Sequence, residues 1–253
     1  GPDDRDAFSE GIVRMANLIL TGRAKQFLEA YVGGVDPLTG LSNRRDFDSR
    51  VTYGLSRVEG GTLLIMDLDF FKKVNDSFGH PAGDQVLRGF ARIVREAVKK
   101  TDVVCRWGGE EFAVWLPNTY GRNALSVAKR IRAKVKQLRI EHEGKLVHNG
   151  RGSLSVSIGL TEVAPSSNEF EMPEDTLTEL TVGNGGLREE VLKGAYVLKR
   201  ATQTADGALY DAKHGHGEAL EDDEGLPGDD SEKGRNCVRI RPLDLSLSEE
   251  KNG

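Results

Sequence analysis

The sequence predicts an α/β fold, in which short apolar strands alternate with amphipathic helices. Residues 62–66 are an uninterrupted apolar run, which is typical of a strand buried on both faces. Two further apolar runs lie on either side of the glycine pair at 108–109, a pattern typical of a β-hairpin. Residues 82–98 and 123–138 carry apolar side chains at helical spacing and therefore predict two amphipathic helices.

The same criteria assign the remaining elements. Residues 6–32 predict a helix, because apolar side chains recur every three or four positions, with one phase slip, until Gly33 and Gly34 end the pattern. This stripe is too short to predict a coiled coil. The other expected elements are a helix over 46–58, a strand over 63–67, hairpin strands over 103–107 and 112–116, and a strand over 154–160.

Length and composition restrict the class of protein. With 253 residues, the chain has room for one large domain or for a domain with an appendage. No apolar run approaches the ~18 residues of a membrane span, and a net charge of −5 argues against nonspecific nucleic-acid binding. Cys105 and Cys237 lie apart in predicted strands, which argues against a disulfide framework or a zinc site and fits a reducing, cytoplasmic compartment.

Two pairs of acidic residues indicate a metal site. Asp67 and Asp69 end the first buried strand, and Glu110 and Glu111 follow a glycine pair whose two-residue turn needs positive φ at both positions. Adjacent carboxylates repel each other unless a cation lies near them, and hard oxygen ligands suit Mg²⁺. The alternative interpretation is that the aspartates cap the next helix and the glutamates are solvated.

The acidic residues lie within a longer set of motifs. Through these motifs the chain resembles the GGDEF family, which comprises the catalytic domains of diguanylate cyclases. Its glycine pair and the residues after it, at 108–112, have the Gly-Gly-Glu-Glu-Phe form of the family motif. The other matching segments follow in the family's order and cover roughly residues 36–240. They are DPLTGLSNR at 36–44, DLDFFKKVND at 67–76, FGH at 78–80, GD at 83–84, SVSIG at 155–159, ADGALYDAK at 205–213 and GRN at 234–236.

The resemblance implies a fold and an activity. The fold would be a central mixed, mostly antiparallel sheet flanked by helices, in the nucleotidyl-cyclase and polymerase-palm arrangement. The activity would be the condensation of two GTP molecules into cyclic di-GMP and two pyrophosphates, by attack of a ribose 3′-hydroxyl on an α-phosphate across a homodimer. Each site would hold two Mg²⁺ ions, with Mn²⁺ as a substitute. The alternative is a catalytically silent receptor for GTP or cyclic di-GMP.

The resemblance also implies roles for single residues. Asp67, Glu110 and the backbone carbonyl of Leu68 would bind the metal, and Glu111 would either touch the metal or take the hydroxyl proton. Asp69 matches a family acid to which no role is assigned. The residues expected to hold the nucleotide's phosphates are Gly108, Gly109, Phe70, Phe71, Lys72, Lys213 and Arg235, of which Phe70 and Phe71 would act through backbone N–H groups at a helix start. Lys73 has no such match and is expected to be solvent-exposed.

Asn75 and Asp84 are the expected guanine readers. A carboxylate can accept hydrogen bonds from both N1–H and the 2-amino group of guanine, and adenine offers neither donor. A site built to pair buried polar groups discriminates by roughly 10⁴-fold against a base that leaves those groups unpaired. We therefore predict that the enzyme uses GTP in preference to ATP. The alternative for Asp84 is a carboxylate favoured by the N-terminal end of its helix.

The family's inhibitory product site has Arg, two residues, then Asp shortly before the glycine pair. This chain has Lys99 and Asp102 at those positions. Lysine lacks the planar fork that stacks on and pairs with guanine, so we predict weak or absent inhibition by product. The alternative is that Lys99 and Lys100 are ordinary basic residues at a helix C-terminus.

The expected domain organisation has three parts. Residues 1–34 are expected to form a signalling or linker helix, which would either pair with its counterpart in a dimer or pack on its own domain. The Gly-Pro start is typical of a protease-cleavage remnant, so an upstream sensory domain is expected to be missing. Residues 35–242 form the catalytic domain, with insertions near 164–190 and 215–232. The second insertion is acidic, either a solvated loop or a flap near the phosphates. Residues 243–253 form a tail.

Overall fold

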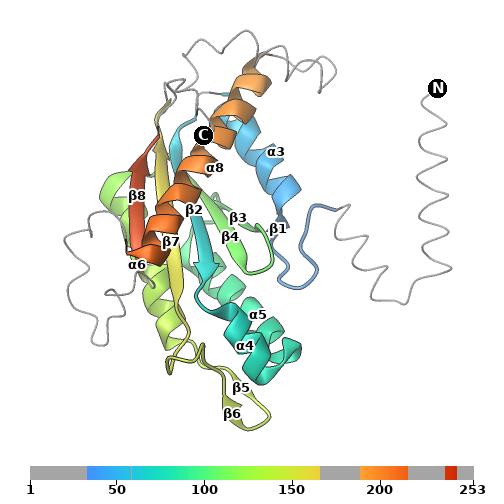
Figure 1. The fold of residues 1–253 in the computed structure, drawn as a ribbon. Coiled ribbons are helices and arrows are strands. Elements are labelled where there is room, and N and C mark those ends of the chain that lie inside the picture. The colour runs from blue at the N-terminus through green and yellow to red at the C-terminus, as the bar shows by residue number, and fades with distance from the viewer. Residues whose placement is uncertain (1–32, 58, 166–188, 216–236, 244–253) are drawn as a thin grey trace, which may run out of the picture.

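The computed structural model describes residues 33–57, 59–165, 189–215 and 237–243 (Figure 1). The predicted N-terminal helix, most of the first insertion, nearly all of the second, Arg235 and the tail lie outside the described residues.

A six-stranded sheet forms the centre of the domain, in the order β1-β3-β4-β2-β7-β8. The two outer pairs, β1 with β3 and β7 with β8, are parallel, and the three inner pairs are antiparallel. The predicted mixed, mostly antiparallel sheet is therefore confirmed. The strands are β1 Ser42–Asn43, β2 Gly61–Leu68, β3 Val103–Arg106, β4 Glu111–Pro117, β7 Val156–Val163 and β8 Val238–Pro242.

Helices cover both faces of this sheet (Figure 1). On one face lie α4 Phe71–Phe78, α5 His80–Ala97 and α6 Gly121–Gln137, and on the other lie α3 Arg44–Leu55 and α8 Glu189–His214. Successive residues of β2 pack into the two cores in alternation, Leu64 and Met66 with α4, α5 and α6, and Leu63 and Ile65 with α3 and α8. This double burial explains why β2 has no polar face in the sequence.

Local sequence explains how two of the helices are built. The side chain of Asn43 caps α3 by accepting a hydrogen bond from Asp46 N at 3.0 Å. Helix α8 runs without a break through residues 202–204. It lies so close to β7 that a Cβ on Gly159 would stand 2.2 Å from Ala205 O.

Other predictions need correction. The strand expected at 154–160 is β7, which starts two residues later. Strand β3 ends before Trp107, and Cys237 lies one residue before β8. The small hairpin of β5 Glu141–His142 and β6 Lys145–Leu146 was not predicted, because two-residue strands leave no periodic pattern. Within the described part of the chain, none of the helices is long and apolar enough to span a membrane.

Candidate active site

The sheet brings three of the predicted site residues together at one end of β2. Asp67 is 5% exposed and lies directly opposite Glu111 of β4 in the antiparallel register. Residues directly opposite each other present their side chains on the same face. Lys213, from the last turn of α8, places Nζ 2.8 Å from Asp67 Oδ2. A buried carboxylate, a second carboxylate and a lysine thus meet across three elements.

The hairpin that carries Glu110 and Glu111 has a wider tip than predicted. Four residues separate β3 from β4, and neither Gly108 nor Gly109 has a positive φ, so the expected two-residue turn is wrong. Instead the N–H groups of Trp107 and Gly108 both donate to Glu111 O, at 2.8 and 3.2 Å. A Cβ on Gly108 would lie 2.6 Å from Glu111 Oε2, so a larger residue there would displace the end of the Glu111 side chain.

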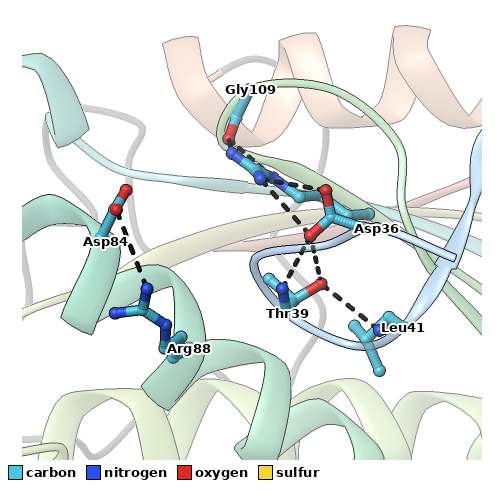
Figure 2. Close-up of polar contacts among 7 residues, drawn as sticks. Asp36, Thr39, Leu41, Asp84, Arg88 and Gly109 are labelled. Atoms are coloured by element: carbon cyan, nitrogen blue, oxygen red, sulfur yellow. Dashed lines mark hydrogen bonds and ion pairs between the residues drawn. The ribbon is translucent and has the colours of Figure 1, made fainter. Parts of the chain in front are cut away.

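An ion pair fixes this tip to the start of the domain, as Figure 2 shows. Arg106 Nη1 lies 3.2 Å from Asp36 Oδ2, and Arg106 Nη2 donates to Gly109 O at 2.7 Å. The other oxygen of Asp36 accepts from the backbone N–H and the hydroxyl of Thr39. Sequence reasoning assigned Asp36 only to the opening motif and missed Arg106, because nothing in their spacing shows that they meet.

Asp69, two residues from Asp67, has its own partners on the β7 segment. It is 2% exposed, and its two carboxylate oxygens accept from Ser155 Oγ and Ser157 Oγ, each at 2.8 Å. Its N–H donates to Ser155 O at 2.9 Å. These contacts give Asp69 a structural position between β2 and β7.

Helix α4 begins beside these acids. Phe70, the residue before it, has a left-handed backbone with φ 56°, and Phe71 is buried in the core. Lys72 and Lys73 are exposed on the first turn. The Phe70 ring, in contrast, is half-buried and lies against two cations, Lys73 Nζ at 4.9 Å and the Arg151 guanidinium at 4.5 Å from its centroid.

The two expected guanine readers lie on neighbouring helices, Asn75 on α4 and Asp84 in the first turns of α5. A Cβ on Gly83 would stand 2.0 Å from Asn75 Oδ1, so the glycine leaves room for the amide. Asp84 is partly exposed, and its carboxylate lies 3.9 Å from Arg88 Nη2, a loose pair one turn along the helix (Figure 2).

Behind the hairpin tip, α3 and α8 contribute residues that the sequence did not indicate. The guanidinium of Arg44 lies 4.2 Å from the centre of the Trp107 ring. Asp206 of α8 also faces this region: burial and the neighbouring Glu111 carboxylate raise its pKa, and Arg44 lowers it. Asp206 was noted only as part of a motif, since no sequence signal brings α8 to the hairpin.

Comparison with known proteins decides the family. A family model described as "Diguanylate cyclase, GGDEF domain" matches residues 34–180. The chain belongs to the GGDEF-domain family.

Individual GGDEF proteins agree with this assignment. The chain is 39% identical over 152 residues to the response regulator PleD of Caulobacter vibrioides and 41% identical over 152 residues to diguanylate cyclase A of Treponema denticola. These matches cover 58% and 60% of this chain and 32% of each relative, so the chain spans about a third of the curated relatives it matches. The GGDEF domain of DgcB from Caulobacter crescentus, solved in complex with c-di-GMP, superposes with a TM-score of 0.56 at 26% identity, over 82% of this chain and 95% of that one.

The oxygen atoms available at this site are of the kind that binds a magnesium ion. Asp67, Glu110 and backbone carbonyls supply hard oxygens, and Leu68 N lies 3.4 Å from Glu110 O, which ties the two acidic segments together. Among the described residues, no three His, Cys, Asp or Glu side chains gather closely enough to hold a metal by themselves. Proteins usually bind Mg²⁺ through one or two carboxylates, with substrate phosphates completing the coordination.

The stretch at the position of the GGDEF family's product site is held locally. Asp102 is 4% exposed, and its carboxylate accepts from Lys99 N at 2.7 Å. Arg95 donates to the carbonyl oxygens of both Lys99 and Asp102. Asp102 therefore fixes the turn after α5.

Proposed function

We propose that this domain is a diguanylate cyclase, which joins two GTP molecules into cyclic di-GMP and releases two pyrophosphates. The observation that carries the proposal is the end of β2, where buried Asp67 faces Glu111 and contacts Lys213 at 2.8 Å. The relatives named diguanylate cyclase support it. Because the match covers only about a third of those relatives' length, the proposal concerns this domain, with residues 35–242 as its extent and an upstream sensory domain as its control in the bacterial cytoplasm.

Asp67, Glu110 and the carbonyl of Leu68 are the proposed Mg²⁺ ligands. When bound, the two ions of a site supply positive charge at the α-phosphate and the leaving pyrophosphate and make the 3′-hydroxyl more acidic. Glu111 lies opposite Asp67, and its carboxylate is the proposed acceptor of the hydroxyl proton.

The remaining residues bind and orient the substrate. The N–H groups at the start of α4, the ammonium of Lys72 and the guanidinium of Arg235 would hold the phosphates. Lys213 would exchange its contact with Asp67 for the phosphate chain when the nucleotide binds. Asn75 and Asp84 would pair with guanine.

A symmetric product requires two sites that face each other, so the active form is proposed to be a homodimer. Each protomer would contribute one GTP, with its hydroxyl aligned to the partner's α-phosphate. Such positioning converts a bimolecular reaction into an effectively unimolecular one and is the main catalytic contribution.

The test is product formation from GTP and Mg²⁺, separated by chromatography, with Glu110→Ala beside the wild type. Losing a metal ligand removes several kcal/mol of charge stabilisation, so the rate should fall on the order of 10³-fold. Glu143→Ala, in the exposed turn of the β5–β6 hairpin, is the matched control and should retain full activity. GTP binding without product in the wild type would favour the silent receptor instead.

A further inference from the structure

A second group of cations lies beside α4, outside the residues that the family motifs assign. The Arg151 guanidinium and Lys73 Nζ lie 4.5 and 4.9 Å from the centroid of the same Phe70 ring. Phe70 is the residue that precedes α4, where phosphate is proposed to bind. Two positive charges are therefore held close together at the N-terminal end of a substrate-binding helix.

The loop that carries Arg151 is fixed in place by a buried amide. Asn149 is 1% exposed; its Nδ2 donates to Ser155 Oγ at 3.1 Å and to Asp69 O at 3.4 Å. Its Oδ1 accepts from Arg151 N at 3.1 Å. Arg151 thus starts from a backbone that is tied to the residue directly before Phe70.

The same loop also contacts the far end of α4. The ring of His148 packs edge-on against Phe78, the last residue of the helix, with centroids 5.2 Å apart. Between these contacts, a Cβ on Gly150 would lie 3.5 Å from Lys73 Cδ. Because the loop touches the first turn and the last residue of the helix, Arg151 keeps its position relative to the proposed phosphate contacts.

The loop of Arg151 is also joined to the end of β2. It leads directly into β7, where Val156 pairs with Leu68. Helix α8, which packs on β7, places Lys213 against Asp67. Arg151 and Lys213 therefore reach the segment 67–70 from the strand next to β2 and from a helix packed on that strand.

We propose that Arg151, with Lys73 beside it, is a further binding residue for the triphosphate, acting on its terminal phosphates. This inference rests on the proposed function, since it takes GTP as the ligand of the site. The positive charges of Arg151 and Lys73 at the Phe70 ring repel each other, and a polyanion bound between them would relieve that repulsion. The planar guanidinium also matches phosphate oxygens in a bidentate way. The competing explanation is that Arg151 only covers the Phe70 ring.

Equilibrium binding tests the proposal without requiring turnover or dimerisation. We would measure calorimetric binding of pyrophosphate and of a GTP analogue that cannot release pyrophosphate, both with Mg²⁺. Arg151→Gln keeps a planar, stacking end group and loses the charge, so both ligands should bind about tenfold more weakly. Arg151→Lys should recover part of the loss. Guanosine, which has no phosphate, should bind the variant and the wild type equally.

The control is Arg122→Gln, an exposed arginine at the start of α6, which lies at the opposite end of β2 from Asp67. It removes the same charge far from the site and should leave binding unchanged. Equal affinity of Arg151→Gln and wild type for pyrophosphate and the analogue would overturn the proposal, as would an equal loss for guanosine. Wild type that binds the analogue but makes no cyclic di-GMP would contradict the proposed function alone; wild type that binds neither ligand would remove both.

Discussion

Two aspartates that are close in sequence have different partners. The sequence predicted Asp67 and Asp69 as one acidic pair. In the structure Asp67 contacts Lys213 and faces Glu111, whereas both oxygens of Asp69 accept hydrogen bonds from serines of the β7 segment. The distinction could not be predicted, because it depends on which strand pairs with β2 on that side.

This difference predicts opposite effects of substitution. Asp69→Asn loses charge-assisted hydrogen bonds in the interior, and the free energy of unfolding should fall by about 1–3 kcal/mol. The variant's KM for GTP should change little. Asp67→Asn should instead lose activity by orders of magnitude. Urea unfolding and initial rates measure the two effects, and an inactive Asp69→Asn of unchanged stability would make Asp69 a catalytic residue.

Asp84 carries the prediction about base choice. It is partly exposed at the start of α5 and holds only a loose pair with Arg88 at 3.9 Å, so its carboxylate is available to guanine. Asp84→Ser should admit ATP and reduce the roughly 10⁴-fold preference for GTP by at least about 10². Product analysis with each nucleotide measures this. Arg88→Ala is the control and should keep the preference; no ATP product from Asp84→Ser would refute this role of Asp84.

At the scale of elements, long periodic segments were predictable and short irregular ones were not. The apolar run of β2 and the stripes of α5 and α6 define their elements to within a few residues. The hairpin was predicted, but its tip geometry was wrong, because two backbone N–H groups share one carbonyl there. The loop that holds Arg151 has no periodicity, so its contact with α4 could be found only in the structure.

The turn after α5 carries the prediction about product inhibition. Lys99 replaces the family's arginine, and Asp102 is buried in contact with the Lys99 backbone. Added cyclic di-GMP should therefore leave the initial rate unchanged at micromolar concentrations. Lys99→Arg restores a planar guanidinium group, which can pair with and stack on guanine, and should strengthen product binding by about tenfold or more. Tight product binding by the wild type that is lost on substitution of Lys99 and Asp102 would contradict this interpretation.

At the scale of the whole molecule, three parts of the chain meet at the Asp67 end of β2. The hairpin tip contributes Glu111, α8 contributes Lys213, and the loop before β7 places Arg151 against the Phe70 ring. The sequence motifs identified the acids and lysines one by one. They could not show how these segments converge, which results from strand order. With one nucleotide in each site, the proposed reaction requires two protomers.

The most direct test is the rate of cyclic di-GMP formation from GTP and Mg²⁺ over a wide range of protein concentrations. Synthesis across a homodimer predicts a rate per molecule that rises with concentration as dimers form and then levels off. Mixing wild type with excess Glu110→Ala should suppress the rate, because mixed dimers hold one defective site. A rate per molecule that is constant down to concentrations where the protein is monomeric would contradict synthesis across a homodimer, and no cyclic di-GMP at any concentration would contradict the cyclase itself.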